Sequence, residues 1–136
     1  MSPPDFSLRL RVYWEDTDAG GVVFFANYLK FFERARTEWL RSLGIGQREL
    51  RERTGGMFVV SETSVRYLQP ARLDDELLVT AELQEAGRAS LVIAQRALLQ
   101  PAGAVLASGS IRIGWVEAAT LRPARIPANI LEAMNQ

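Results

Sequence analysis

The chain has 136 residues, of which 48% are hydrophobic and 24% are charged, a composition typical of one soluble domain spanning residues 1–136. Its 16 basic and 16 acidic residues cancel, which argues against a general nucleic-acid-binding or anionic-membrane surface. The sequence contains no histidine and no cysteine, which excludes a Ser-His-Asp triad, a cysteine nucleophile and an ordinary zinc site. Any acid–base chemistry must therefore come from carboxylates, lysine, tyrosine or the backbone.

The N-terminal residues show no targeting signal. The opening MSPPD has neither the basic region nor the apolar run of a signal peptide. No segment approaches the roughly 18 apolar residues that a membrane span needs. We therefore expect a cytoplasmic protein with no membrane span and no nucleic-acid partner.

The first two predicted elements are a strand and a long helix. Apolar and polar residues alternate with a period of two over residues 6–14, which predicts a strand with Trp14 on its buried face. A loop follows, and from about Ala26 to Leu43 the apolar residues recur at helical spacing. Gly44 occupies the position of a left-handed helix cap. The residues that share the apolar face of this helix are Tyr28, Phe32, Ala35, Trp39 and Leu43.

Four more strands are predicted after a short polar segment that adds a helical turn. The predicted strands cover residues 57–69, 76–86, 89–99 and 104–116, and the last residues form a short helix. The links between the strands are short and rich in turn formers, as antiparallel hairpins require. The predicted fold class is α+β, with one long helix packed on a five-stranded, mainly antiparallel sheet. Because one helix covers only part of such a sheet, we expect self-association to cover more of it.

The loop EDTDAGG before the helix combines three acids with two glycines, and three interpretations are open. It is a simple turn, since Asp forms local bonds to the backbone and Gly adopts positive φ. A second interpretation is a calcium loop, with Asp16, Asp18 and Gly21 at positions one, three and six. Gly20 then stands where an oxygen ligand is needed, and Asn27 stands where a bidentate Glu belongs. The calcium interpretation is therefore disfavoured.

The third interpretation is catalytic and depends on the junction between loop and helix. The first N–H groups of a helix have no internal acceptor, and with the helix dipole they stabilise a developing negative charge. The apolar run over residues 22–25 is expected to keep this end dry. An upstream aspartate that folds back beside it supplies a carboxylate. A carboxylate and an oxyanion hole suffice for acyl-transfer hydrolysis without histidine or cysteine.

The segment RVYWEDTDAGGVVFFANYLKFFERARTEWLRSLGI resembles the signature of hotdog-fold acyl-CoA thioesterases of the 4-hydroxybenzoyl-CoA thioesterase type. Within them it is most similar to the branch associated with the Tol–Pal system. Two later stretches, YLQPARLDDEL and ASLVIAQRA, resemble the same branch, and the similarity covers roughly residues 8–127. The resemblance implies a homodimer joined sheet edge to sheet edge, usually paired into a homotetramer, with active sites at subunit interfaces.

Two catalytic positions follow from the resemblance. The second Asp of the family's D-x-D pair falls on Asp18, which implies a role as nucleophile or general base. The family's oxyanion donor, a backbone N–H at the helix start, falls on Phe25. Many relatives of the Tol–Pal-associated branch have a histidine there, so this chain lacks any imidazole at the site but keeps the backbone donor.

Further positions are candidates for contact with an acyl-CoA substrate. Asn27 either caps the helix or touches the substrate. The resemblance places Phe58 and Val59 beside the thioester, although both residues also suit the core of the sheet. Phe24, like Phe25, Phe31 and Phe32, either lines an aromatic acyl pocket or fills the helix–sheet interface.

The coenzyme is expected to bind at a turn. Arg88 and Ser90 match a region that contacts the nucleotide end of coenzyme A in the family, and phosphates require cationic or backbone donors. Coenzyme A enters as part of the substrate, so the predicted protein has no separate cofactor and no metal.

Two alternatives to a thioesterase stay open. One is a non-catalytic acyl-CoA-binding or interaction protein that keeps the fold, which Phe25 in place of histidine favours and an intact Asp18 disfavours. The other is a hotdog dehydratase or hydratase, which the absence of histidine argues against.

Overall fold

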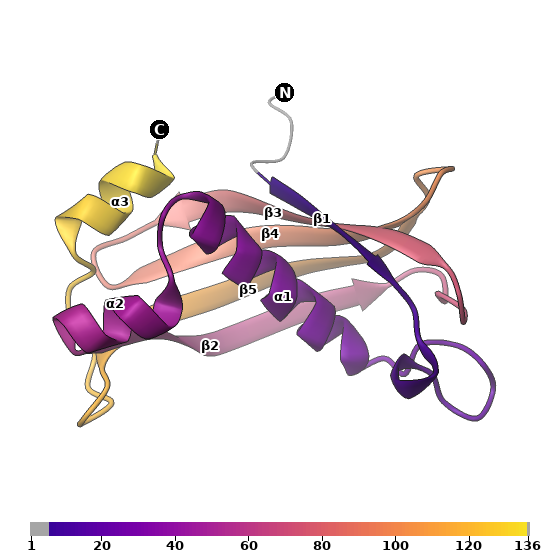
Figure 1. Cartoon of the computed structure of the whole chain (residues 1–136), viewed down its shortest axis with the longest axis horizontal. Helices are drawn as coiled ribbons and strands as arrows, with labels where there is room; N and C mark the ends of the chain where they lie inside the picture. The colour runs from indigo at the N-terminus through magenta and orange to yellow at the C-terminus, as the bar shows by residue number, and fades with distance from the viewer. Residues whose placement is uncertain (1–5, 136) are drawn as a thin grey trace.

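The computed structural model describes residues 6–135, which form one sheet with helices on one face and at one end (Figure 1). The elements in chain order are β1 (Phe6–Arg11), a 3₁₀ turn (Trp14–Asp16), α1 (Asn27–Ser42), α2 (Gln47–Thr54), β2 (Gly56–Tyr67), β3 (Glu76–Ala86), β4 (Ser90–Leu99), β5 (Val105–Glu117) and α3 (Ala128–Met134). The five strands are ordered β1-β3-β4-β5-β2, and every neighbouring pair is antiparallel. The predicted α+β class, with one long helix on a five-stranded antiparallel sheet, is confirmed.

The N-terminal strand is shorter than predicted. It ends at Arg11, and the side chain of Trp14 is 76% exposed, so its prediction as a buried strand residue is wrong. The cause is Asp16, whose carboxylate accepts the N–H of Tyr13 at 2.9 Å. That bond closes a 3₁₀ turn and carries the chain away from the sheet.

The segment between α1 and β2 forms more helix than predicted. Residues Gln47–Thr54 form α2, an eight-residue helix, where one helical turn was expected. The predicted cap after α1 is confirmed, since Gly44 has a φ of +83°. Gly56, the first residue of β2, packs so closely on Trp115 that an added Cβ would lie 2.3 Å from the indole ring. Only glycine allows the backbone at position 56 to lie this close to the ring of Trp115.

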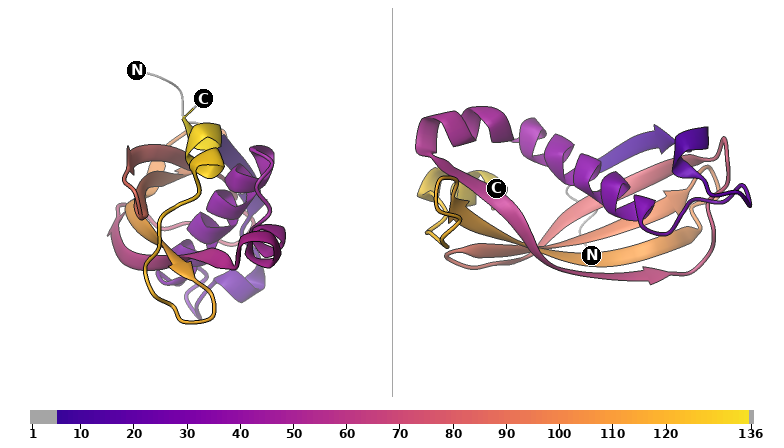
Figure 2. Two further views of the ribbon diagram at one scale, coloured as in Figure 1. Left: turned by 90° about the vertical axis from the view of Figure 1, so that its left-hand side faces the viewer. Right: turned by 90° about the horizontal axis from the view of Figure 1, so that it is seen from below.

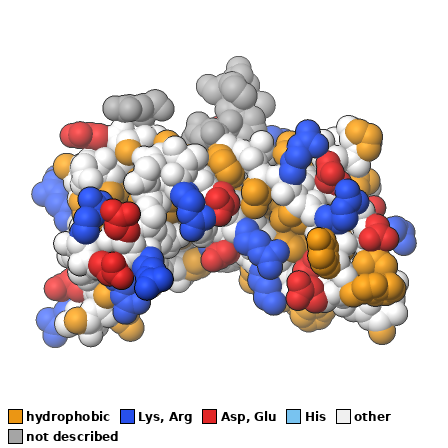
Figure 3. Space-filling view, viewed as in Figure 1, with side chains coloured by type: hydrophobic (Ala, Val, Ile, Leu, Met, Phe, Trp, Pro, Cys, Tyr) orange, Lys and Arg blue, Asp and Glu red, His pale blue; other side chains and the backbone are white. Residues whose placement is uncertain are grey.

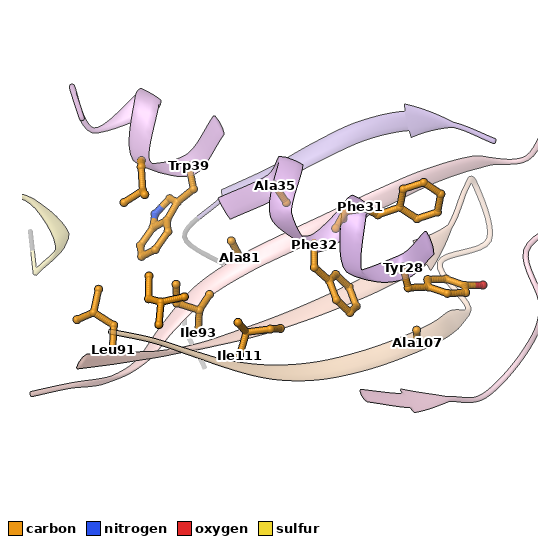
Figure 4. Packing of buried hydrophobic residues seen from close by; sticks show 14 of the residues in the cluster. Tyr28, Phe31, Phe32, Ala35, Trp39, Ala81, Leu91, Ile93, Ala107 and Ile111 are labelled. Atoms are coloured by element: carbon orange, nitrogen blue, oxygen red, sulfur yellow. The ribbon is translucent and has the colours of Figure 1, made fainter. Parts of the chain in front are cut away.

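The core lies between the apolar face of α1 and the concave face of the sheet (Figures 2 and 4). Phe31, Phe32 and Ala35 are fully buried, as are Leu91 and Ile93 on the facing strand β4. Burying one such aromatic or aliphatic side chain stabilises the fold by about 1.5–3 kcal/mol relative to leaving it exposed. Phe31 and Phe32 therefore fill the helix–sheet interface and do not line an open pocket.

A buried polar cluster ties α1 to the middle of the sheet. Gln95 on β4 is 1% exposed, and its side-chain amide donates to the carbonyl of Phe32 at 2.9 Å and to that of Thr80 at 3.1 Å. Its oxygen accepts a hydrogen bond from the guanidinium of Arg36 at 3.0 Å. Because these bonds join α1, β3 and β4, they fix the position of the helix over the sheet.

Two features of the architecture matter for the site. The sheet has two edge strands, β1 and β2, and β2 is a twelve-residue strand. The start of α1 lies at one end of the molecule, whereas α2 and α3 lie at the other end (Figure 1). Within residues 6–135, no helix combines the length and the apolar character that crossing a lipid bilayer requires.

Candidate active site

The loop that precedes α1 is folded back on itself and held by its own backbone. Thr17 and Val23 form an isolated antiparallel bridge, and the N–H of Asp18 donates to the carbonyl of Val22 at 2.9 Å. The carbonyl of Asp16 accepts two further bonds, from the N–H of Phe24 at 3.0 Å and from the side-chain amide of Asn27 at 2.7 Å. The side chain of Asn27 therefore holds the loop against the start of the helix.

The two aspartates of the loop have different surroundings. Asp16 is 6% exposed, and its carboxylate is used inside the 3₁₀ turn, as the turn interpretation expects. Asp18 is exposed, and its carboxylate accepts only the N–H of Gly20, at 2.8 Å, among the residues that the structure describes. Of these two aspartates, Asp18 is therefore the one whose carboxylate is accessible to a substrate.

The backbone at the start of α1 offers a donor. The turn into the helix is closed by the N–H of Asn27, which donates to the carbonyl of Phe24 at 2.8 Å, and by that of Tyr28, which donates to the carbonyl of Phe25 at 3.3 Å. The N–H of Phe25 has no acceptor within residues 6–135. This free donor stands at the positive end of the helix dipole, in the same folded loop as Asp18.

Aromatic rings cluster around the side chain of Phe25. The ring centroid of Phe25 lies 4.9 Å from that of Phe24 and 5.9 Å from that of Tyr67, and Tyr67 lies 5.5 Å from Tyr28. The rings of Phe25, Tyr28 and Tyr67 border a groove of about 240 Å³ that continues along Leu68, just after β2. The groove is open, since Phe25 is 60% exposed, and the neighbouring Phe24 is 46% exposed. The predicted dry environment is therefore incomplete in a single chain.

Two tyrosines that line this groove, Tyr67 and Tyr28, differ in how the sequence predicted them and in what they contact. Sequence reasoning did not select Tyr67, although it begins the YLQPARLDDEL stretch that carries the family resemblance. Tyr28 is 3% exposed, which confirms its prediction as a core residue. Its hydroxyl accepts the N–H of Ala71 at 3.2 Å, and burial raises the pKa of Tyr28 above its ordinary value. Tyr28 therefore stays neutral and supports the loop after β2.

The other predicted contact residues lie at the opposite end of the sheet. Phe58 packs edge-on against Trp115 at 5.0 Å, and it lies with Val59 near the start of β2, far along the strand from Tyr67. Arg88 is exposed in the β3–β4 turn, and the hydroxyl of Ser90 accepts a hydrogen bond from the guanidinium of Arg112 at 3.2 Å. A single chain brings Phe24, Phe25 and Asn27 together with Asp18 but leaves these four residues apart from it.

The described residues contain no group of three or more histidine, cysteine, aspartate or glutamate side chains placed to hold a metal ion. In the loop considered for calcium, the Asp16 carboxylate points to the Tyr13 N–H. The carboxylate and backbone donor of this site require no metal for acyl transfer.

Comparison with known proteins identifies the family. A model described as the thioesterase-like superfamily matches residues 12–134. The acyl-CoA thioesterase YbgC of Haemophilus influenzae is 39% identical over 130 residues, which cover 96% of this chain and 94% of that protein. The acyl-CoA thioester hydrolase YbgC of Escherichia coli O6:H1 is 39% identical over 137 residues, which cover 100% of both chains.

Solved structures share the fold. A probable thioesterase from Bartonella henselae has a TM-score of 0.82 at 30% identity, covering 89% of this chain and 98% of that one. A 1,4-dihydroxy-2-naphthoyl-CoA thioesterase from Synechocystis has a TM-score of 0.89 at 21% identity, covering 96% of each chain, and its likeness concerns the fold alone. The chain belongs to the thioesterase-like superfamily and has the hotdog fold.

Proposed function

We propose that this protein hydrolyses acyl-CoA thioesters, with Asp18 as the reacting carboxylate and the N–H of Phe25 as the oxyanion donor. The observation that carries the proposal is the free N–H at the start of α1 beside the loop with an accessible aspartate. The names of the full-length relatives, acyl-CoA thioesterase and acyl-CoA thioester hydrolase, support the substrate class.

The chemistry has two forms that use the same groups. In the first, a carboxylate oxygen of Asp18 attacks the thioester carbonyl carbon, the C–S bond breaks, and the coenzyme thiolate leaves and takes up a proton. Water then hydrolyses the mixed anhydride. In the second, Asp18 accepts a proton from a water molecule that attacks the same carbon. In both forms negative charge develops on the carbonyl oxygen, which the Phe25 N–H stabilises.

A second copy of the chain completes the proposed site. Along β2 of one chain, Phe58 and Tyr67 lie near opposite ends of the strand. If two β2 edges pair antiparallel along their length, Phe58 of the partner subunit approaches the end of β2 where Tyr67 packs edge-on against Phe25. The partner's surface then covers the aromatic groove and reduces the exposure of Phe25. A dimer, alone or paired into a tetramer, is therefore part of the proposal.

The same arrangement gives the predicted coenzyme residues a role. Arg88 lies in the β3–β4 turn and Ser90 is the first residue of β4, both at the same end of the sheet as Phe58. Edge pairing places this end of the partner subunit toward the catalytic loop. We therefore assign Arg88 to the coenzyme phosphates across the interface, and coenzyme A enters only as part of the substrate. The Tol–Pal association and an aromatic acyl group of the 4-hydroxybenzoyl type stay predictions from the resemblance.

A non-catalytic acyl-CoA-binding protein is the second candidate, because Phe25 replaces the histidine of many relatives. Release of free thiol from a panel of acyl-CoA esters separates the two. We expect thiol release proportional to enzyme concentration for at least one ester. Binding of an acyl-CoA without thiol release from any ester would support the binding protein instead.

A further inference from the structure

The middle of α1 carries a buried cation without a carboxylate partner. Arg36 is 9% exposed, and its guanidinium donates to the neutral side-chain oxygen of Gln95. Ion pairs occur elsewhere in residues 6–135, yet none includes Arg36. Burial lowers the pKa of Arg36, and the charge of Glu33 opposes that shift. A buried charge is normally paired, since removing it from water is expensive without a counter-ion.

Arg36 borders open space on two sides. A groove of about 590 Å³ between α1 and β2 is lined by Leu29, Glu33, Arg36, Val60 and Thr63 among others, and a second of about 210 Å³ continues past Arg36 toward α2. Figure 3 shows the outline of the molecule indented where β2 passes below α1, with side chains of both charge signs around the indentation. The guanidinium therefore has donors left over beside a space that another molecule can enter.

The groove carries charges of both signs. Lys30 and Arg34 add two positive charges to that of Arg36, whereas Glu33 supplies the negative charge and lines both grooves. Val60, which is 50% exposed, gives the rim an apolar contact. In a two-fold symmetric interface, each contact between two different residues occurs twice, so one surface must carry both partners. Glu33 and Arg36 meet that requirement.

The position of the groove also favours a second copy. Val60 and Thr63 lie on either side of the middle of β2, whose outer edge is unpaired in the single chain. A two-fold axis through the middle of this edge places the two grooves against each other. The groove is remote from the proposed oxyanion donor, which lies just before the start of α1. Arg36 is nine positions along the helix from its first residue, Asn27, or about 14 Å at 1.5 Å per residue.

We propose that Glu33 of the partner subunit enters this groove and pairs with Arg36, and that the same pair forms twice about the dimer axis. This inference rests on the edge-paired dimer of the proposed function and names the charges that specify it. Arg36 then gains a carboxylate within ion-pair distance, which no described residue of its own chain provides. Gln95 holds the guanidinium ready in the orientation that the interface needs.

A mixing experiment separates a pair between subunits from a pair within one helix. In Glu33→Arg alone, positions 33 and 36 of both copies are positive, and in Arg36→Glu alone both are negative, so each homodimer sets like charges against each other. A heterodimer of the two variants restores both intersubunit pairs and neither intrachain pair. Sedimentation velocity is expected to show at least a roughly tenfold weaker dimer for each variant alone and recovery on mixing.

Controls make every outcome decisive. Glu38, which forms an ion pair with Arg41 on the same helix, does not line either groove, so Glu38→Arg should dimerise like the unchanged protein. If Arg36→Glu fails to fold, Glu33→Arg decides alone, because Glu33 is exposed and its dimer is still expected to weaken at least roughly tenfold. An unchanged dissociation constant in Glu33→Arg, or no recovery in a mixture of two folded variants, overturns the pair.

Thiol release from an acyl-CoA, measured on the same samples, keeps this result apart from the proposed function. If the protein releases thiol and Glu33→Arg leaves the dimer dissociation constant unchanged, the charge pair is contradicted and the enzyme proposal stands. An inactive dimer that Glu33→Arg dissociates supports the charge pair and contradicts the enzyme proposal.

Discussion

At the scale of single residues, the proposed oxyanion donor is a backbone group, so the side chain at position 25 is not what reacts. The ring of Phe25 contacts Phe24 and Tyr67, whereas its N–H has no acceptor in the described chain. Under the proposed mechanism, a chain with no histidine therefore still has a donor for the carbonyl oxygen. It also separates the roles of the ring and the N–H experimentally.

Phe25→Pro removes the N–H without breaking a hydrogen bond, because Phe25 lies two residues before α1 and its N–H has no acceptor in the described chain. We expect kcat to fall roughly 100- to 1,000-fold, because the transition state loses about 2.7–4 kcal/mol of stabilisation. Phe25→Ala is the matched control, which keeps the N–H and loses only the ring. Steady-state thiol release measures both; equal kcat values for the two variants would remove the N–H from the mechanism.

Tyr28→Phe tests the neutral, structural role of that hydroxyl. The change leaves the Ala71 N–H without its acceptor, which is expected to lower the free energy of unfolding by about 1–3 kcal/mol. Because the folded-state pKa of Tyr28 is raised above 10.0, its contribution is fully present below pH 10 and is lost as the pH rises through the raised value.

Urea unfolding between pH 7 and pH 11 checks this prediction. The unchanged protein should lose stability above pH 10 by more than Tyr28→Phe does. Parallel stability curves for the two proteins over this range would show that Tyr28 is not the titrating group.

The sequence was informative about residue types here but not about their orientation. The acid-rich loop and Asp18 were selected from the sequence, yet nothing in the pattern shows that the Asp16 carboxylate turns back to the Tyr13 N–H. Because of that local bond, the first strand ends before Trp14, although the alternation of apolar and polar residues predicted that it would continue that far. Tyr67 escaped selection because its contact with Phe25 joins residues 42 positions apart.

At the scale of elements, the helix that carries the donor is positioned by polar contacts as well as by its apolar face. The spacing of apolar residues predicted α1 to within one residue at each end. In β4, Gln95 falls on the same parity as Leu91, Ile93 and Ala97, so the alternation indicates that it points inward. Its partners on α1 and β3 come from the tertiary structure and could not be read from that pattern.

Gln95→Met keeps the approximate volume of the side chain and removes its hydrogen bonds. The buried guanidinium of Arg36 and the carbonyl of Thr80 then lose partners, so the free energy of unfolding is expected to fall by at least about 1–3 kcal/mol. Gln84→Met, at an exposed position of the neighbouring strand, is expected to change it by less than about 0.5 kcal/mol. Chemical denaturation measures the free energy of unfolding of both variants, and equal losses would contradict a stabilising role for the buried polar cluster around Gln95.

At the scale of the whole molecule, the isolated chain holds the two halves of the proposed site at opposite ends of β2. Hairpin-like links predicted antiparallel strands, but the order β1-β3-β4-β5-β2 depends on which strands meet in space. That order makes β2 an edge and leaves the groove beside Arg36 open. The proposal of a second copy rests on this arrangement and on the exposure of Phe24 and Phe25.

Specific activity should therefore depend on dimer formation. On dilution through the dissociation constant measured by sedimentation, thiol release per chain is expected to fall in parallel with the dimer fraction. Constant specific activity across that range, with the monomer dominant at the lowest concentration, would show that one chain is sufficient.

The most direct test of the catalytic claim is kcat for Asp18→Asn against the best acyl-CoA substrate of the unchanged protein. The substitution keeps the size of an exposed side chain and removes its charge, so circular dichroism and the dimer dissociation constant should not change. Since a general base alone contributes roughly 10²–10⁴-fold, kcat is expected to fall by at least about 100-fold. An Asp18→Asn protein that releases thiol at a rate near that of the unchanged enzyme would contradict the account.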